Sequence, residues 1–111
     1  MNKDLNLHET FKLAIENHQK NNINEAIDLY YKILESDPNN SSIHYNLGLA
    51  FDKKKELNKA IESYKKVIEI DPNFLSAHFN LGVIFKELGD LENEINCYKK
   101  TLSIDPNHSK A

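Results

Sequence analysis

Two histidines, His44 and His78, are the residues of this chain whose type could most readily perform chemistry. Imidazole nitrogens bind metals and exchange protons near neutral pH. The two residues are 34 positions apart, however, and no His-x3-His or Cys-x2-Cys pattern accompanies them. If they occupy equivalent places in two repeated units, they are separated by a whole repeat translation. We therefore interpret both as packing residues, and we predict no metal site and no cofactor.

Cys97 is the single cysteine, and its surroundings do not indicate a nucleophile. It lies on a polar stretch, so a bystander thiol is the favoured interpretation. One cysteine cannot form an internal disulfide, which fits a reducing compartment. The chain has no glycine-rich phosphate loop, and its carboxylates are spread out without an evident pair in an apolar setting. We predict no catalytic residues and a protein that is not an enzyme.

The elements that position these residues repeat along the chain. Pro38, Pro72 and Pro106 follow one another at steps of 34 residues. The same step relates Leu13, Leu47 and Leu81; Ile27, Ile61 and Ile95; and Tyr30, Tyr64 and Tyr98. Self-similarity at one fixed period indicates an array of identical supersecondary units.

Apolar residues between the prolines follow the spacing of helices. Ile43, Leu47 and Phe51 share one helix face, and a short polar link at 53–58 precedes a second such helix. A short link makes the two helices an antiparallel hairpin, and Asp-Pro ends the second one. The sequence therefore predicts an all-α solenoid. Its six helices are expected at residues 8–20, 24–36, 42–54, 58–70, 76–88 and 92–104.

Small residues recur inside the first helix of each unit, as Ala14, Gly48 and Gly82. A glycine inside a helix costs roughly 1 kcal/mol relative to alanine. Its presence at an equivalent place in two units indicates that the paired helices approach closely there.

These residues resemble the signature of the tetratricopeptide repeat (TPR) family. The second unit carries it through Asn46, Leu47, Gly48, Phe51, Ala60, Tyr64 and Pro72. The third carries it through Asn80, Leu81, Gly82, Phe85, Gly89, Tyr98 and Pro106, and the first keeps Ala26, Tyr30 and Pro38. The resemblance implies a right-handed superhelix of three antiparallel hairpins. Its expected divisions are a tail at 1–6, repeats at 7–40, 41–74 and 75–108, and a remnant at 109–111.

One position departs from the family pattern. Glu94 stands where the first two units have Ala26 and Ala60. A carboxylate at a close-contact position must reach solvent or be paired. We therefore predict that the third hairpin is splayed or less stable than the others.

A second apolar stripe follows each predicted first helix. Tyr45 and Leu49 are one turn apart, and Leu49 lies about 200° around the helix from Leu47. The equivalent pairs are Phe11 with Ile15, and Phe79 with Val83. The resemblance implies that first helices line a concave surface and that these positions face its ligand. The alternative is that contacts between successive first helices occupy these side chains.

Asn46 and Asn80 accompany this stripe, and Lys12 replaces the amide in the first unit. The two asparagines resemble the ladder with which the repeat domain of O-GlcNAc transferase holds peptide backbone. An amide offers both donors and an acceptor to an extended chain. The alternative is a pair of solvated asparagines in an asparagine-rich protein.

The family's carboxylate clamp, which grips the acidic C-terminal tails of heat-shock chaperones, does not match. It requires lysines, asparagines and an arginine in the groove. Phe11, Ile15, Ser76 and Asn80 differ at those places, and Asn46 alone fits. We predict that the chain does not bind the C-terminal tails of heat-shock chaperones.

Composition argues against other partners. All 14 basic residues are lysine and the net charge is −3. Such a chain lacks the guanidinium contacts and basic surface that nucleic-acid binding uses. No segment approaches membrane-spanning length, and residues 1–7 have no apolar core of secretory length. We expect a cytoplasmic protein without a nucleic-acid or membrane partner.

We predict a protein–protein interaction scaffold that binds a peptide or helical segment in a mainly apolar concave groove. Two alternatives remain open: a self-associating structural TPR module, and the N-terminal repeat portion of a larger enzyme such as a glycosyltransferase. The predicted groove residues are Phe11, Ile15, Tyr45, Asn46, Leu49, Phe79, Asn80 and Val83.

The end of the array predicts a homodimer. Each repeat of a solenoid covers the apolar face of its neighbour. Residues 107–111 are too few for a stable capping helix. We expect apolar surface to be left open there. Either the chain is a fragment of a longer array, or the surface is buried between molecules, and we expect two copies to associate end against end. The residues expected to contribute are Tyr98, Leu102, and Leu81 or Phe85.

Overall fold

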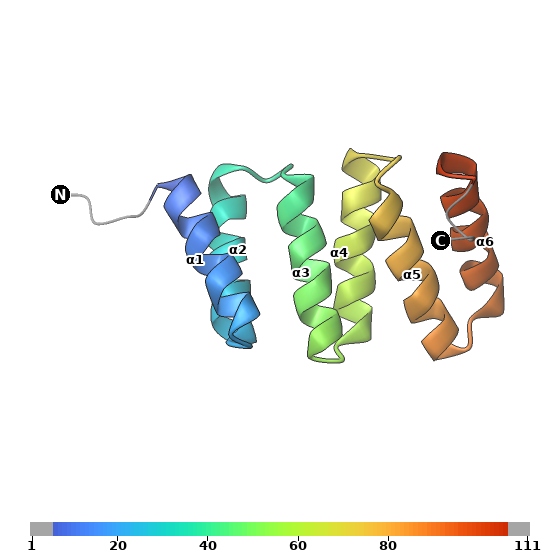
Figure 1. The fold of residues 1–111 in the computed structure, drawn as a ribbon, viewed down its shortest axis with the longest axis horizontal. Coiled ribbons are helices and arrows are strands. Elements are labelled where there is room, and N and C mark those ends of the chain that lie inside the picture. Colours follow the sequence, from blue (N-terminus) through green and yellow to red (C-terminus); the bar gives the residue numbers. More distant parts are fainter. Residues whose placement is uncertain (1–5, 107–111) are drawn as a thin grey trace.

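The computed structural model describes residues 6–106, which form six helices arranged in a row (Figure 1). The predicted all-α solenoid of three hairpins is confirmed. The predicted 109–111 remnant, and the predicted tail apart from Asn6, lie outside the described residues. The helices are α1 (Leu7–Gln19), α2 (Ile23–Ser36), α3 (Ser41–Lys53), α4 (Leu57–Ile70), α5 (Leu75–Leu88) and α6 (Leu91–Ile104).

Each helix begins one residue before its predicted start. The side chains of Asn6 and Asn40 accept hydrogen bonds from the backbone N–H groups of Glu9 (2.8 Å) and Ile43 (3.1 Å). These bonds satisfy donors that have no partner within α1 and α3. Phe74, by contrast, precedes α5 without a side-chain cap.

The turn inside each hairpin uses one residue in the left-handed region. These residues are Asn21, Lys55 and Gly89, with φ of 68°, 64° and 76°. They are one repeat period apart, so the same backbone turn recurs three times although only the third unit supplies glycine. Asparagine tolerates this conformation and lysine adopts it at some strain.

Close approach within the hairpins explains the helix glycines. A Cβ atom added at Gly48 would lie 2.5 Å from Cε1 of Tyr64, and one at Gly82 would lie 2.6 Å from Cε1 of Tyr98. Real Cβ atoms do not approach carbon so closely. The tyrosine of the second helix therefore occupies the space that the glycine leaves free, and the paired helices approach closely there, as the sequence predicted.

The third hairpin is as tightly closed as the second, so the expectation that it is splayed is wrong. The distance at Gly82 matches that at Gly48 within 0.1 Å, as 2.6 Å against 2.5 Å. Thr101 is buried, and its hydroxyl donates to the carbonyl of Cys97 at 2.9 Å. A polar residue is accepted in α6 because its hydrogen bond is made within the helix.

Lower stability of this hairpin stays a prediction, centred on Glu94. Its carboxylate is partly buried, whereas Ala26 and Ala60 at the equivalent places are fully buried. Replacing Glu94 by alanine should raise the melting temperature, with a gain on the order of 1 kcal/mol. Favourable interaction of the carboxylate with the start of α6 offsets part of that gain. Glu92→Ala, an exposed change in the same turn, is the matched control in thermal unfolding at low protein concentration. A clear fall for Glu94→Ala would mean that this carboxylate has a productive partner.

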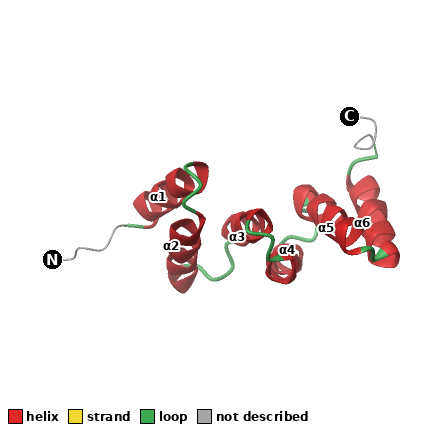
Figure 2. Ribbon diagram, turned by 90° about the horizontal axis from the view of Figure 1, so that it is seen from below, coloured by secondary structure: helices red, strands yellow, loops and turns green. Residues whose placement is uncertain are grey.

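The helices form two layers along the row. Figure 2 shows α1, α3 and α5 along one side, with α2 and α4 along the other. Contacts join α2 to α3 and α4 to α5, so α2 and α4 are each covered by the first helix of the next hairpin. The row measures 52 × 24 × 23 Å. Within residues 6–106, no helix is both long and apolar enough to cross a membrane.

Candidate functional site

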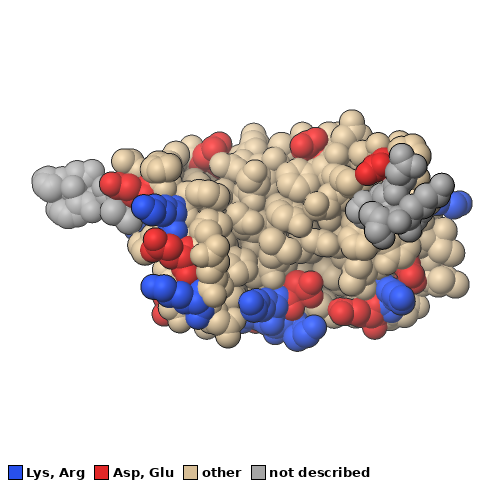
Figure 3. Space-filling model, viewed as in Figure 1, with Lys and Arg blue, Asp and Glu red and all other residues tan. Residues whose placement is uncertain are grey.

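The six apolar residues predicted for the groove all lie on the first helices. We call them the groove strip: Phe11 and Ile15 on α1, Tyr45 and Leu49 on α3, and Phe79 and Val83 on α5. The layer that carries them faces the viewer in Figure 3. The middle of this face is uncharged. Lys, Asp and Glu side chains gather along its lower edge and at its left end, and separate acidic side chains stand along its upper edge. An apolar band on such a face suits an apolar partner better than a charged one.

Tyr45 is held both by its own repeat and by the following one. Its ring centroid lies 5.0 Å from that of Phe74 and 5.7 Å from that of Tyr64. Its hydroxyl accepts a hydrogen bond from Nδ2 of Asn80 at 3.1 Å. Contacts between repeats therefore use much of this side chain, as the alternative interpretation of the strip expected.

Phe74 is a residue that the sequence interpretation missed. It stands one period after Asn40 and two periods after Asn6, where the other units have a helix-capping asparagine. That departure was the available signal, because an aromatic residue cannot cap a helix. The ring instead supports Tyr45 from the start of α5.

The two phenylalanines of the strip remain accessible. Phe11 and Phe79 each expose 37% of their surface, whereas Ile15, Leu49 and Val83 are partly buried. The ring of Phe79 lies 5.9 Å from that of Tyr98. The strip is thus partly open, with its exposed aromatic surface at the two outer repeats.

The two asparagines of the predicted ladder have different surroundings. Nδ2 of Asn80 donates to the hydroxyls of Tyr45 (3.1 Å) and Tyr64 (3.4 Å), so both of its donors are directed at protein. The side chain of Asn46 is partly buried and makes no such bond to those tyrosines. An incoming peptide would find the amide of Asn46 better placed to donate than that of Asn80.

Two buried tyrosines lie beneath this surface. Burial raises the pKa of Tyr30 to about 12 and raises the pKa of Tyr64 still further, so both hydroxyls stay neutral. Tyr30 shares a 2.8 Å hydrogen bond with Nδ1 of His18. Burial, and secondarily the charge of Lys53, lowers the pKa of His18 below its ordinary value. The neutral imidazole suits this bond, and it serves packing between α1 and α2.

His44 and His78 have the equivalent packing roles that the sequence predicted. Nε2 of His44 lies 2.9 Å from the carbonyl oxygen of Pro38, and Nε2 of His78 lies 2.7 Å from that of Pro72. Each histidine can donate to the carbonyl that Asp-Pro leaves free at the connection between repeats. The pair therefore ties two successive connections to the first helix that follows.

Among residues 6–106, the remaining candidate groups for chemistry are a single thiol and scattered carboxylates. Burial raises the pKa of the Cys97 thiol, which keeps it protonated rather than nucleophilic. In the part of the chain that the structure describes, no three His, Cys, Asp or Glu side chains are grouped as metal ligands would be.

The repeated units of the chain match known family models. Sequence models described as TPR repeats match residues 16–55, 41–74 and 75–108. The chain belongs to the tetratricopeptide repeat (TPR) family. A search of curated protein sequences found no match.

Solved TPR structures share the fold. A crystal structure of MamA is 27% identical, with a TM-score of 0.87, and covers 95% of this chain and 61% of that one. A second MamA structure is also 27% identical, with a TM-score of 0.84, covering 94% and 57%. This chain therefore spans only about three fifths of the length of MamA. The first TPR of Spaghetti (RPAP3), bound to the HSP90 peptide SRMEEVD, is 22% identical, with a TM-score of 0.84, covering 91% and 80%.

Proposed function

We propose that this TPR protein is a non-enzymatic scaffold that binds a peptide or helical segment along the groove strip. The observation that carries the proposal is the pair of exposed phenylalanines, Phe11 and Phe79, on a face whose middle is uncharged. Apolar patches of this kind mark interaction sites on soluble proteins. The repeats proposed to build the groove are residues 7–40, 41–74 and 75–108, and the protein is proposed to work in the cytoplasm.

The ligand should bind with modest affinity. Full burial of an apolar side chain contributes roughly 1.5–3 kcal/mol, so half-burial of six contributes about 5–9 kcal/mol. Association costs about 4 kcal/mol or more, so the strip alone leaves at most about 5 kcal/mol, a dissociation constant of about 0.2 mM at best. The strip should select a segment with apolar or aromatic side chains, while Asn46 can hydrogen-bond its backbone.

A displayed peptide library, selected on the purified protein, tests this function. We expect enrichment of sequences with apolar and aromatic residues. The double change Phe11→Ser and Phe79→Ser should weaken the binding of a selected peptide at least about tenfold, as loss of two aromatic contacts implies. The far-UV circular dichroism should stay unchanged, because both side chains are substantially exposed.

Tyr31→Ser is the matched control for this experiment. Tyr31 is an aromatic residue of α2 with 49% of its surface exposed, outside the groove strip. Its variant should bind the selected peptide like the unchanged protein. Equal loss with Tyr31→Ser, or full binding by the double variant, would contradict the groove.

We also propose that acidic chaperone tails do not bind. The places of the family's clamp hold Phe11, Ile15 and Ser76, and the chain contains no arginine to pair with a terminal carboxylate. The RPAP3 repeat that binds SRMEEVD has the same fold, but its 22% identity does not transfer the ligand. Fluorescein-labelled SRMEEVD should show no saturable change in polarisation. Binding that is lost when the peptide's terminal carboxylate is amidated would show that a clamp is present.

A further inference from the structure

One face of α6 is apolar and uncovered in the structure. Leu91 and Ile95 expose 64% and 43% of their surfaces, whereas Ile23 and Ile27, at the equivalent places of α2, expose 7% each. The difference arises because α3 covers α2, while α6 lies at the end of the row (Figure 1). Leu102 extends the same face and is also exposed. Leu81 and Phe85, which were expected to share this open surface, are buried, so that part of the expectation is wrong.

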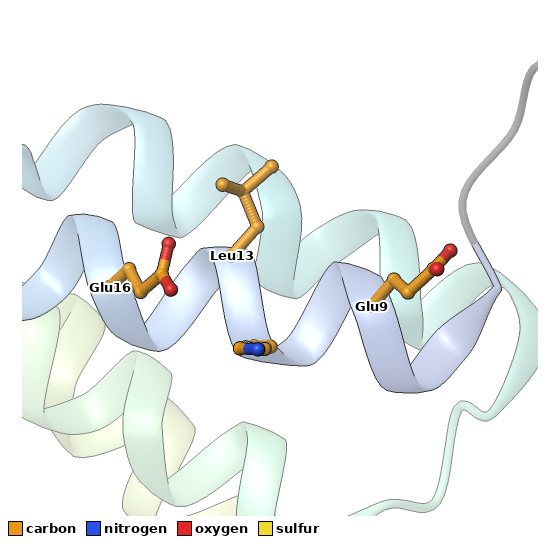
Figure 4. Close-up of a pocket in the computed structure, with 4 residues that line it drawn as sticks. Glu9, Leu13 and Glu16 are labelled. Carbon is orange, nitrogen blue, oxygen red and sulfur yellow. The ribbon is translucent and has the colours of Figure 1, made fainter.

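The opposite end of the array has a different chemistry. Glu9 and Glu16 of α1 are exposed, and they stand where α3 has the buried residues Ile43 and Ala50. Between them lies Leu13, which in Figure 4 points to the side of α1 away from α3 and α4. These residues, with Lys12, line a shallow hollow on α1. A polar outer face is what a terminal repeat needs to stay exposed to water.

We infer that the uncovered face of α6 is a homodimer interface, in which two copies pack α6 antiparallel across a two-fold axis. Leu91, Ile95 and Leu102 are spaced by four and seven residues, so they form one stripe along the helix. The two-fold axis brings Leu91 of each copy beside Leu102 of the other and places the two Ile95 side chains near the axis. The stripe is therefore complementary to itself.

Charge on the flank of the stripe favours the same arrangement. Glu92 and Lys99 are exposed and seven residues apart, so they lie on one side of the stripe. In an antiparallel pair, Glu92 of each copy meets Lys99 of the other, and symmetry makes this contact twice. Flanking pairs of opposite charge set orientation and partner choice in helix pairing.

A head-to-tail arrangement, with α1 of a second copy on α6, is less favourable. It would repeat the contact of α2 with α3, and Lys20 would meet Glu92 as Lys54 meets Asn24 at 2.7 Å. An exposed ion pair of this kind contributes little. The same arrangement would press Glu9 and Glu16 against leucine and isoleucine, and desolvating two carboxylates is costly.

Sedimentation velocity of the 111-residue chain from about 10 μM to about 500 μM tests the dimer. The mass should rise from 12.8 kDa toward twice that value, with a dissociation constant on the order of 100 μM, because the interface is small. Ile95→Asp should keep the chain monomeric. Leu13→Asp introduces the same change at the other end and should leave the dimer intact.

Reversing the charge of Glu92 or of Lys99 provides a second test, which leaves the apolar stripe of α6 unchanged. Glu92→Lys and Lys99→Glu should each weaken self-association about tenfold, because each creates two contacts of like charge. A mixture of the two single variants should form a heterodimer as tight as the original dimer, since both contacts are then restored. Circular dichroism at low concentration checks that each variant is folded.

Each other outcome overturns the proposal in a specific way. A strict monomer across the concentration range means that something other than a second copy covers α6. Loss of association with Leu13→Asp but not with Ile95→Asp means that copies stack head to tail. If neither charge variant changes the dissociation constant of the dimer, and mixing the two variants does not tighten association, the antiparallel register is excluded.

Discussion

Replacing Tyr64 by alanine should lower the free energy of unfolding by about 3–5 kcal/mol, the usual cost of deleting a buried aromatic side chain. Tyr64 is fully buried, and its ring fills the space that Gly48 leaves in α3. The ring of Tyr45 lies 5.7 Å away, and Asn80 donates to the hydroxyl at 3.4 Å. The change therefore opens a cavity within one hairpin and removes a contact to the next. Urea unfolding followed by circular dichroism measures the loss.

The chain contains its own control for this change. Tyr98 has the same place in the third repeat but is only partly buried, because none of the helices within residues 6–106 packs on the outer side of α6. Tyr98→Ala should cost clearly less than Tyr64→Ala. Tyr64→Phe, which removes only the hydroxyl, should cost about 1 kcal/mol. Equal losses for Tyr64→Ala and Tyr98→Ala would show that the middle repeat contributes no more than the last.

A single added methyl group at Gly48 should also destabilise the protein. Gly48→Ala gains about 1 kcal/mol of helix propensity. It also places Cβ 2.5 Å from the ring of Tyr64, and overpacking of a core typically costs 1–3 kcal/mol. Because Tyr45 of the same repeat and Asn80 of the next repeat both contact Tyr64, the ring cannot withdraw freely. We expect a net loss of about 1–2 kcal/mol in chemical unfolding.

Gly82→Ala distinguishes the crowding from a general effect of the substitution. Its added Cβ would lie 2.6 Å from the ring of Tyr98, which is nearly the same distance. Tyr98 is partly exposed, so its ring can move toward solvent and relieve the contact. This variant should be close to neutral. A gain in stability for Gly48→Ala would mean that Tyr64 adapts to an alanine, the residue that the first repeat has at the equivalent place, Ala14.

The architecture could be predicted because every physical signal repeats. Period, helix spacing, Asp-Pro ends and small residues agree with one another in each unit, which is the condition under which local signals determine a fold. Close approach of the paired helices at Gly48 and Gly82 followed from the same reasoning, whereas the tyrosines that fill the space were not predicted. All six helix starts were misplaced by one residue, with or without a side-chain cap, since apolar spacing does not locate a helix end to within one residue.

The candidate site was less predictable because the same helix position can face either a ligand or a neighbouring repeat. Spacing placed Tyr45 on the second apolar stripe, but it could not show that Phe74 and Asn80 of the next repeat would enclose it. Contacts between repeats depend on how far successive hairpins rotate, and no short-range pattern encodes that rotation. The same ambiguity hid the burial of Leu81 and Phe85, which α4 and α6 cover from two sides.

The contacts of Tyr45 also bear on how such a groove can change over evolution. A residue that both lines the surface and joins two repeats cannot be replaced without weakening the array. Phe11 and Phe79 carry more exposed surface, so substitutions there alter what the surface recognises at little cost to folding. New specificity should therefore arise first at the outer repeats. At the middle repeat, by contrast, the contacts of Tyr45 should restrict which substitutions the array tolerates, whatever ligand it binds.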